Sequence, residues 1–384
     1  MERLEGMIKD RTAVIGVIGL GYVGLPLATI FAKKGFTVIG ADIKADVVDK
    51  INRGESPINE PGLGELLSDV VGQKRLSATT DGAKAVRAAD ILFLVVQTPI
   101  TKDKEPDLSN FKAAWTTVAE NLSPGKLLVS ESTIPPGTMK DIVAPILEKS
   151  RLSAGRDFHL AYSPERAIPT RTLIEMQENG RVVGGFTDTG AELAALAYSQ
   201  ITSGAITKVD IETAEMVKVI ENAYRDVNIA LANQMAEIAE SMDRNGVEVL
   251  RLASMHPRVS FLDPGIGVGG HCIPVDPWFL HHAAPELSSL IVAARSINDG
   301  RSERTATKIA PRVAAIENPR VVVAGIAYKE DVADTRQSPA IRIVEDLEAR
   351  GVDVVVYDPL VLGVQADLRD LCSGADLLAI VVGH

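Results

Sequence analysis

The chain has 384 residues, a hydrophobic fraction of 46% and a formal net charge of −11. Its length exceeds one ordinary domain, so we expect two or three, and no apolar run of about 18 residues predicts a membrane span. The acidic balance argues against a general binder of nucleic acid or membrane surfaces, which needs a basic face.

The first part of the chain alternates β-branched apolar runs with helical patterns. Its first residues, Met1–Thr12, are charged and lack the apolar core of a secretory signal. Strands are expected at Ala13–Leu20, Phe36–Ile43, Asp90–Gln97, Lys126–Ile134 and Phe158–Tyr162. Helices are expected between them, for example at Leu25–Lys34, Asn110–Asn121 and Met139–Lys149. This alternation predicts an α/β fold with βαβ units and a parallel sheet, and we assign residues 1–203 to a Rossmann domain.

The middle of the chain changes character. A run without proline from Asp210 to Asn245 predicts one long helix, on the order of 50 Å. Apolar residues fall on more than one side of it, which favours a helix buried between domains or subunits. We therefore expect a central helical domain over residues 204–300 and a homodimer built around the long helix.

The last segment returns to α/β alternation. Strands are expected at Arg320–Ile326, Val352–Tyr357 and Ala375–Val382, with a helix near Ser338–Arg350. This pattern predicts a second, smaller Rossmann-like domain over residues 301–384.

A glycine-rich turn, Gly19–Gly24, follows the first expected strand and opens the first expected helix. In this context Gly19 makes the tight turn, Gly21 lets a pyrophosphate approach, and Gly24 permits close packing of helix on strand. Asp42 ends the next strand, where its carboxylate can accept hydrogen bonds from the adenosine ribose and disfavours a 2′-phosphate. The pattern predicts NAD rather than NADP, and the alternative is a glycine turn with no cofactor.

A loop rich in Gly and Pro, Phe261–Pro277, contains Cys272, with glycines at positions 265, 267, 269 and 270. We interpret these glycines as removing side chains so that a ligand can come close to the thiol, which is a strong nucleophile as the thiolate. The alternative is a buried small hydrophobe, which we accept for Cys372. Two cysteines cannot form a disulfide framework, so we expect a reducing, cytoplasmic setting.

Asp276 lies four residues after Cys272, and the two side chains face the same way if Pro274 is in the first turn of a helix. A carboxylate there can orient or deprotonate a water that hydrolyses a thioester. The alternative is a turn or N-cap aspartate.

On the long helix, Lys218, Asn222 and Arg225 share one face. Lys218 and Asn222 can donate hydrogen bonds to an oxyanion. The alternative is a solvated polar stripe.

Six motifs resemble the UDP-glucose/GDP-mannose dehydrogenase family: GLGYVGLPLA, ESTIPPGT, SPER, VKVIENAYRDVNIALANQ, GVGGHCIPVDPW and AYKEDVADTRQSP. They cover almost the whole chain, in order. The resemblance implies an N-terminal NAD domain, a central dimer-forming region and a C-terminal UDP-binding domain. It also implies oxidation of a sugar C6 hydroxyl to a carboxylate with two NAD⁺, through a cysteine thioester.

The resemblance assigns roles to individual residues. Cys272 matches the nucleophile and Asp276 its paired carboxylate, while Glu165 matches an acidic residue near the reacting carbon. The expected catalytic residues are Thr133, Glu165, Lys218, Asn222, Cys272 and Asp276. The expected cofactor-binding residues are Gly19, Gly21, Tyr22, Val23, Gly24, Asp42, Thr98, Thr133 and Arg336. The expected substrate-binding residues are Glu165, Arg166, Lys218, Asn222, Arg225, Arg258, Phe261, Gly265, Gly269, His271 and Lys329, and no metal is expected.

Residues beside the cysteine point to a branch of the family. His271 and Val275 stand where members that use UDP-glucose typically carry Ser and Lys. The expected substrate is therefore a UDP-N-acetylhexosamine, with UDP-N-acetyl-D-mannosamine favoured over UDP-N-acetylglucosamine or another UDP-hexose. Thr170 follows the proline of the substrate loop, where the family commonly has Gly.

Two other functions stay open at this point. A hydroxyacid dehydrogenase that transfers two electrons also combines a Rossmann domain with a helical one, but it gives Cys272 no role. A catalytically silent regulator that binds NAD or a UDP-sugar is the other alternative. It is kept open because the family's last domain continues past the strand expected at 375–382, so the resemblance implies a truncated UDP-binding domain.

Overall fold

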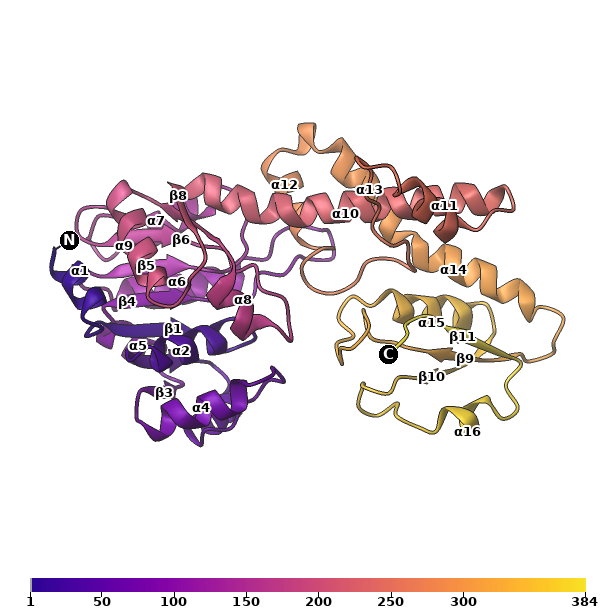
Figure 1. The fold of residues 1–384 in the computed structure, drawn as a ribbon, viewed down its shortest axis with the longest axis horizontal. Helices are drawn as coiled ribbons and strands as arrows, with labels where there is room; N and C mark the ends of the chain where they lie inside the picture. The colour runs from indigo at the N-terminus through magenta and orange to yellow at the C-terminus, as the bar shows by residue number, and fades with distance from the viewer. Residues whose placement is uncertain (1) are drawn as a thin grey trace. The chain divides into compact units, whose positions relative to one another are not determined.

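The computed structural model describes residues 2–384, which divide into two compact units after Val219. The first unit contains one large sheet and the second contains a smaller one. Helix α10 (Ile211–Ser241) starts in the first unit and ends in the second, and it confirms the long helix expected from the sequence (Figure 1).

The strands of the first unit are short and separated by helices. They are β1 (Val14–Ile18), β2 (Thr37–Ala41), β3 (Leu76–Thr79), β4 (Ile91–Leu94), β5 (Leu127–Ser130), β6 (His159–Tyr162), β7 (Arg181–Gly185) and β8 (Ile206–Asp210). The helices are α1 (Glu2–Lys9), α2 (Gly24–Lys33), α3 (Ala45–Asn52), α4 (Leu63–Gly72), α5 (Gly82–Ala88), α6 (Ser109–Glu120), η1 (Met139–Val143), α7 (Ala144–Glu148), α8 (Thr172–Glu178) and α9 (Asp188–Ser199). All five strands expected in this part of the sequence form.

The strand order of this sheet is β3-β2-β1-β4-β5-β6-β7-β8. The order reverses between β1 and β4, the arrangement that lets Rossmann domains bind a dinucleotide at the carboxyl ends of the strands. The prediction of a wholly parallel sheet is wrong in one place, because β6 and β7 pair antiparallel. Helix α8 lies between them and is only about 10 Å long, too short to carry the chain back across the sheet.

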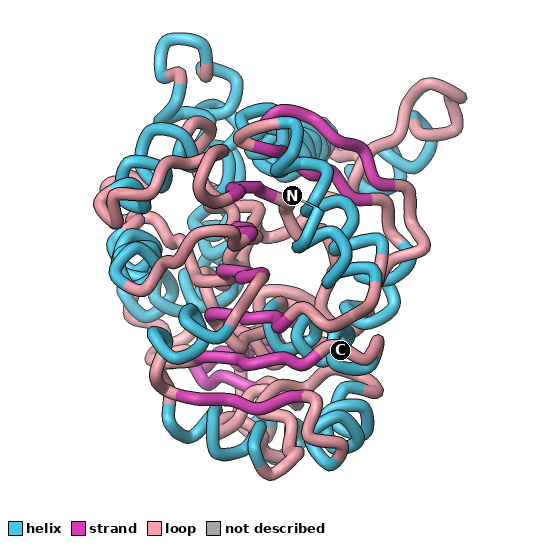
Figure 2. Tube along the Cα trace, turned by 90° about the vertical axis from the view of Figure 1, so that its left-hand side faces the viewer, coloured by secondary structure: helices cyan, strands magenta, loops and turns pink. Residues whose placement is uncertain are grey.

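Apolar side chains cover both faces of the sheet, which Figure 2 shows as a ladder of strands with helices on either side. One face packs against α1, α2 and α9 around Phe31 and Tyr198. The other packs against α5, α6 and α7 around Phe111 and Trp115. Burial on both faces explains why these strands are nearly continuous apolar runs.

The three glycines of the turn after β1 meet different surroundings. Gly19 has φ +93°, and a Cβ there would lie 2.0 Å from the carbonyl oxygen of Val95. A Cβ on Gly24 would lie 1.8 Å from the carbonyl oxygen of Gly19, whereas a Cβ on Gly21 would meet nothing within 4 Å. Gly19 and Gly24 are thus required by the fold, and the space at Gly21 is open, as a bound pyrophosphate would need.

A carboxylate holds the loop between β6 and α8. Glu60 is buried and accepts hydrogen bonds from the main-chain N–H groups of Thr170, at 2.9 Å, and Thr172, at 2.7 Å. These bonds fix Thr170 at φ +74°, a left-handed conformation that β-branched residues rarely adopt. The glycine that the family commonly has at this position would adopt it without strain.

The second unit combines helices with a small parallel sheet. After α10 come α11 (Gly246–Ala253), α12 (Asp276–Ala283), η2 (Pro285–Leu287), α13 (Ser289–Asp299), α14 (Arg301–Ile309), η3 (Ala310–Arg312), β9 (Arg320–Ala324), α15 (Pro339–Ala349), β10 (Asp353–Tyr357), α16 (Leu368–Cys372) and β11 (Leu377–Ile380). The strand order is β10-β9-β11 with parallel pairing, and α14 and α15 pack on β9 through Val321, Ile343 and Leu347. The strands and the helix expected here from the sequence are confirmed. Across residues 2–384, no helix is both long and apolar enough to cross a membrane.

Substitution of two glycines of the turn tests the different constraints on them. Gly24→Ala should lower the free energy of unfolding by about 2 kcal/mol or more, because its methyl group meets backbone. The free energy of unfolding of Gly21→Ala should lie within about 0.5 kcal/mol of the wild-type value. This variant should bind NAD at least about tenfold more weakly, because its methyl group fills the cofactor's space. Urea unfolding and a fluorescence titration with NAD measure the two effects. Equal loss of stability in both variants would contradict this assignment.

Replacement of the strained residue in the substrate loop should stabilise the protein. Thr170→Gly relieves the left-handed conformation, keeps the main-chain bond to Glu60 and loses only an exposed side chain. After the extra flexibility of the unfolded chain is subtracted, we expect a gain of about 0.5–1 kcal/mol. Urea unfolding measures it, with Thr116→Gly on an exposed helix face as the control that should destabilise.

Candidate active site

Asp42 connects the end of β2 to the glycine turn. One carboxylate oxygen accepts a hydrogen bond from the N–H of Leu20, at 2.9 Å, and the other from the N–H of Lys44, at 3.0 Å. A carboxylate has about four acceptor sites, so two stay available for ribose hydroxyls. Helix α2 starts at Gly24 without a side-chain cap, and its first turn carries no acidic residue, which suits an anionic pyrophosphate.

The loops after β4 and β5 are tied together at the same edge of the sheet. The hydroxyl of Thr98 donates to the carbonyl oxygen of Thr133, at 2.5 Å, and the N–H of Val96 donates to the hydroxyl of Ser132, at 2.9 Å. The structure therefore brings Thr98 and Thr133, both expected near the cofactor, into contact. Together with the glycine turn they lie at the carboxyl ends of β1, β4 and β5, where the strand order reverses.

Glu215 of α10 binds main-chain N–H groups of the segment that follows Thr133. Its two oxygens accept hydrogen bonds from the N–H groups of Gly137, at 2.6 Å, and Met139, at 2.8 Å. Burial raises the pKa of Glu215 to about 7, although these two hydrogen bonds oppose the shift. The sequence analysis did not single out Glu215. Lys218, one turn further along α10, is half-buried.

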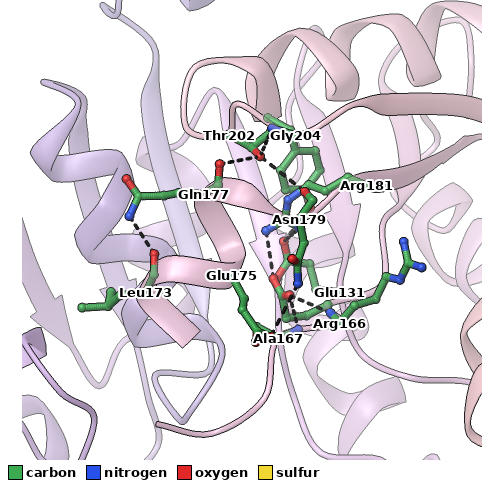
Figure 3. Close-up of polar contacts among 12 residues, drawn as sticks. Glu131, Arg166, Ala167, Leu173, Glu175, Gln177, Asn179, Arg181, Thr202 and Gly204 are labelled. Atoms are coloured by element: carbon green, nitrogen blue, oxygen red, sulfur yellow. Dashed lines mark hydrogen bonds and ion pairs between the residues drawn. The ribbon is translucent and has the colours of Figure 1, made fainter. Parts of the chain in front are cut away.

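Glu165 is held by its own loop and by β7. One oxygen accepts from the N–H groups of Arg166, at 2.6 Å, and Ala167, at 2.7 Å, and the other pairs with Nη2 of Arg181, at 2.8 Å. The Arg166 side chain is exposed and donates to the carbonyl oxygen of Gly180. Figure 3 shows Arg166, Ala167 and Arg181 in this region. Arg181 was missed from the sequence, because only the antiparallel pairing of β6 and β7 places it opposite Glu165.

In the second unit, the amide of Asn222 donates a hydrogen bond of 2.5 Å to the carboxylate of Asp276, and both side chains are buried. The sequence analysis expected both to be catalytic, and the structure joins them. The carbonyl oxygen of Cys272 accepts from the N–H of Asp276, at 2.8 Å, which closes one helical turn between the two residues. The condition that the sequence left open, Pro274 in the first turn of a helix, is not met, since α12 begins at Asp276 and Pro274 belongs to the turn before it.

The glycines before Cys272 serve packing more than ligand access, which corrects the interpretation made from the sequence. A Cβ on Gly269 would lie 2.7 Å from the Cβ of Tyr328 and 2.9 Å from the carbonyl oxygen of Gln337. Gly270 has φ +87° and faces the ring of Tyr328 at 3.0 Å. Only Gly265, of the glycines in this loop, has open space around its Cβ position. The close approach is therefore between the cysteine loop and the loop after β9.

Arg336 brings positive charge to the cysteine loop. Its carbonyl oxygen accepts from the N–H of Gly270, at 2.9 Å, and its guanidinium pairs with Asp334. The hydrogen bonds that Arg336 donates to Asp334 raise its pKa most, burial opposes this shift, and negative charge on Cys272 adds a smaller rise.

The remaining expected substrate residues lie in the second unit at or near the surface. Gly265 is held at both ends, because its N–H donates to Asn233 and its carbonyl oxygen accepts from Arg301, each at 2.8 Å. Phe261 is half-buried and packs against a small cluster on α10 and α11. The exposed members of the set are Arg225, Arg258, His271 and Lys329. Cys372, expected to be buried, is half-exposed, and no group of three His, Cys, Asp or Glu side chains suited to a metal occurs among residues 2–384.

Comparison with known proteins matches three successive parts of this chain to domains of one family. Family models match the chain at residues 13–202 (UDP-glucose/GDP-mannose dehydrogenase family, NAD binding domain), 212–300 (central domain) and 322–384 (UDP binding domain). A UDP-N-acetyl-D-mannosamine dehydrogenase of Pyrococcus horikoshii is 41% identical over 96% of this chain and 89% of its own length. An NDP-N-acetyl-D-galactosaminuronic acid dehydrogenase of Ralstonia solanacearum is 37% identical over 99% of this chain and 93% of its own.

A solved structure agrees with the sequence matches. The UDP-D-ManNAc dehydrogenase from Pyrococcus horikoshii superposes with a TM-score of 0.93 at 40% identity, covering 97% of this chain and 89% of that one. The matched family models include an NAD-binding and a UDP-binding domain, as the sequence predicted. This chain belongs to the UDP-glucose/GDP-mannose dehydrogenase family of NAD-dependent oxidoreductases.

Proposed function

We propose that this chain oxidises the C6 hydroxyl of UDP-N-acetyl-D-mannosamine to the carboxylate, using two NAD⁺ and one water and releasing two NADH. The observation that carries the proposal is the arrangement around Cys272, where a thiol near Arg336 is one helical turn from a carboxylate oriented by Asn222. A dehydrogenase that transfers only two electrons has no use for this nucleophile.

The first unit fits NAD at the carboxyl edge of its sheet. The open space at Gly21, the uncapped start of α2 and the free acceptor sites on Asp42 suit the pyrophosphate and the adenosine ribose. When bound, NAD⁺ supplies the hydride acceptor for both oxidation steps. Because Asp42 is anionic at this position, a 2′-phosphate would be repelled, which favours NAD over NADP.

Cys272 gives the second oxidation a covalent substrate. Its thiolate attacks the aldehyde carbon and forms a C–S bond, and the oxygen takes a proton to give a thiohemiacetal that cannot escape. Oxidation of this adduct leaves a thioester. Asp276 then takes a proton from water as the water attacks, and the C–S bond breaks to release the carboxylate and the thiolate. Asn222 orients Asp276 for this step.

Three further residues, Lys218, Glu165 and Thr133, complete the proposed catalytic set. Lys218 and Asn222 donate to the oxyanion that develops during attack on the carbonyl carbon. Glu165 and Thr133 hold water beside the reacting carbon. Recognition of the UDP-sugar falls to the other expected substrate residues of the second unit, and its C-terminal part matches the family's UDP-binding domain.

The sugar is assigned from the cysteine loop and from the relatives. His271 and Val275 fit the N-acetylhexosamine branch, and relatives named for N-acetyl-D-mannosamine and N-acetyl-D-galactosaminuronic acid both match almost the full chain. UDP-N-acetylglucosamine and other UDP-hexoses are the alternatives. Two free cysteines fit a cytoplasmic location for the reaction.

We also propose a homodimer formed through α10 and α11. Ile220, Tyr224, Leu231 and Ile238 are between 44% and 67% exposed and lie within about 40° of one another around the α10 helix. Val247, Leu252 and Met255 add further exposed apolar surface on and just beyond α11. An apolar patch of this kind indicates a protein–protein contact, and a second copy offers the same face in return.

Stoichiometry and a cysteine variant test the reaction. The wild-type chain should produce two NADH for each UDP-N-acetyl-D-mannosamine consumed, and faster than with UDP-N-acetylglucosamine, UDP-N-acetylgalactosamine or UDP-glucose. Cys272→Ser should lose at least about a thousandfold in kcat while NAD binding stays unchanged, and Cys372→Ser should behave as wild type. Production of one NADH per sugar, or near-normal turnover by Cys272→Ser, would contradict the proposed mechanism.

A charge in the apolar stripe tests the dimer. Leu231→Asp should weaken self-association at least about a hundredfold, because each subunit would bury a carboxylate against apolar surface. Ala113→Asp, an exposed position on α6, is the control and should leave association unchanged. Sedimentation velocity across a concentration series gives both constants. A dimer that survives Leu231→Asp unchanged places the interface elsewhere.

A further inference from the structure

A buried charge cluster of Glu131, Glu165 and Arg181 lies at the carboxyl ends of β5 and β6. Figure 3 shows Glu131 and Arg181. Glu131 directly follows β5, and Arg181 is the first residue of β7. Because β7 runs antiparallel to β6, its first residue lies at the same edge of the sheet where β5 and β6 end. Strand direction therefore brings two carboxylates and one guanidinium together.

Arg181 lies between the two carboxylates but is closer to one of them. Its Nη2 is 2.8 Å from Oε2 of Glu165, and its Nη1 is 3.8 Å from Oε1 of Glu131. The guanidinium also stacks on the ring of Tyr198, 4.5 Å from its centroid. The three charged side chains are 8% exposed or less, so water does not screen their interactions.

The charges in this cluster balance only when one carboxylate is protonated. Burial raises the pKa of Glu131 to about 7, with Glu165 adding to the shift and Arg181 and Tyr198 opposing it. The groups that face Glu131 are Arg181 from β7, Glu165 from the loop after β6 and the Tyr198 hydroxyl from α9, which donates to Oε1 at 2.5 Å. A protonated Glu131 leaves the Arg181–Glu165 pair neutral overall, and an ionised Glu131 leaves one excess buried negative charge.

We propose that Arg181 is a positioning residue that holds the Glu165 carboxyl group fixed in its loop, and that the proton on Glu131 controls how closely Arg181 pairs with Glu165. The inference rests on the proposed role of Glu165 beside the reacting carbon. When Glu131 is neutral, the Arg181 guanidinium forms an ion pair with Glu165 alone. When Glu131 loses its proton, it competes for Arg181 from the other side and weakens the hold on Glu165.

Glu131→Gln tests the control by the proton. The amide keeps an acceptor for Tyr198 but cannot ionise, so Arg181 should stay with Glu165 at every pH. The ratio of kcat for Glu131→Gln to kcat for wild type should be near one at pH 6 and rise at least about threefold by pH 8.5, with its midpoint near 7. The ratio cancels ionisations that both proteins share, and a flat ratio overturns the role of Glu131.

Variants of Arg181 test the positioning. Arg181→Met should lower kcat at least about tenfold with little change in KM for NAD, and it should move the acid limb of the kcat profile up by about 1 pH unit. Arg181→Lys keeps the charge, so its acid limb should stay near that of wild type. Arg156→Met removes an exposed pair of the first unit and should change neither quantity. An acid limb that stays fixed in Arg181→Met means a purely structural role and overturns the proposal.

Urea unfolding tests the Glu131–Arg181–Glu165 network independently of the proposed reaction. It gives a result even if Arg181→Met does not fold or if no UDP-sugar is turned over. The pKa of Glu131 in the folded protein lies above its ordinary value of 4.5, so its contribution to stability is complete below that value and is lost as pH rises through about 7. Wild type should lose urea stability relative to Glu131→Gln between pH 5 and pH 8. Parallel curves overturn the network whether or not the enzyme works.

Discussion

The loops of the proposed site depend on one interaction, a carboxylate that accepts hydrogen bonds from main-chain N–H groups. Loops at the carboxyl ends of strands have N–H groups that no ladder satisfies, and acidic side chains of the same loop or of distant elements satisfy them here. The pattern recurs at Asp42, Glu60, Glu165, Glu215 and Asp358. Burial of Glu215 with two N–H donors raises its pKa to about 7. Burial also opposes ionisation of Asp358, but its N–H donors, together with a bond to a histidine, lower its pKa below the usual value.

The direction of β7 has the largest consequence for the proposed chemistry. A parallel strand would place its first residue at the opposite edge of the sheet, away from Glu165. The antiparallel strand instead supplies Arg181, the buried cation that offsets two carboxylates. A buried pair of this kind contributes little net stability compared with apolar side chains. Its value is a fixed geometry beside the proposed reaction centre, which links the topology of the sheet to the protonation of Glu131.

The sequence predicted what local patterns encode. The glycine spacing predicted the turn at Gly19–Gly24, and the run without proline from Asp210 to Asn245 predicted the long helix α10. Partners distant in the sequence were missed, as with Glu131 and Arg181, which meet only through the order and direction of three strands. The glycines at 269 and 270 were noticed but misinterpreted, because their neighbour Tyr328 lies far along the chain. Glycine removes a side chain for any close approach, and the sequence does not say whether a ligand or another loop approaches.

The two Rossmann-like sheets share the same local arrangement of a glycine and an aspartate, but the two aspartates differ in how many hydrogen bonds they can still accept. In each, a glycine with positive φ follows the first strand in chain order, its N–H donates to the end of the next strand, and an aspartate comes directly after that strand. Asp358 accepts four main-chain N–H groups, two on each oxygen, and is fully buried. Its acceptor sites are filled, so it holds the turn and has none left for a ribose. Asp42 accepts only two and is partly exposed, and this difference, rather than the glycine motif itself, makes the first sheet the one that can bind a dinucleotide at its aspartate.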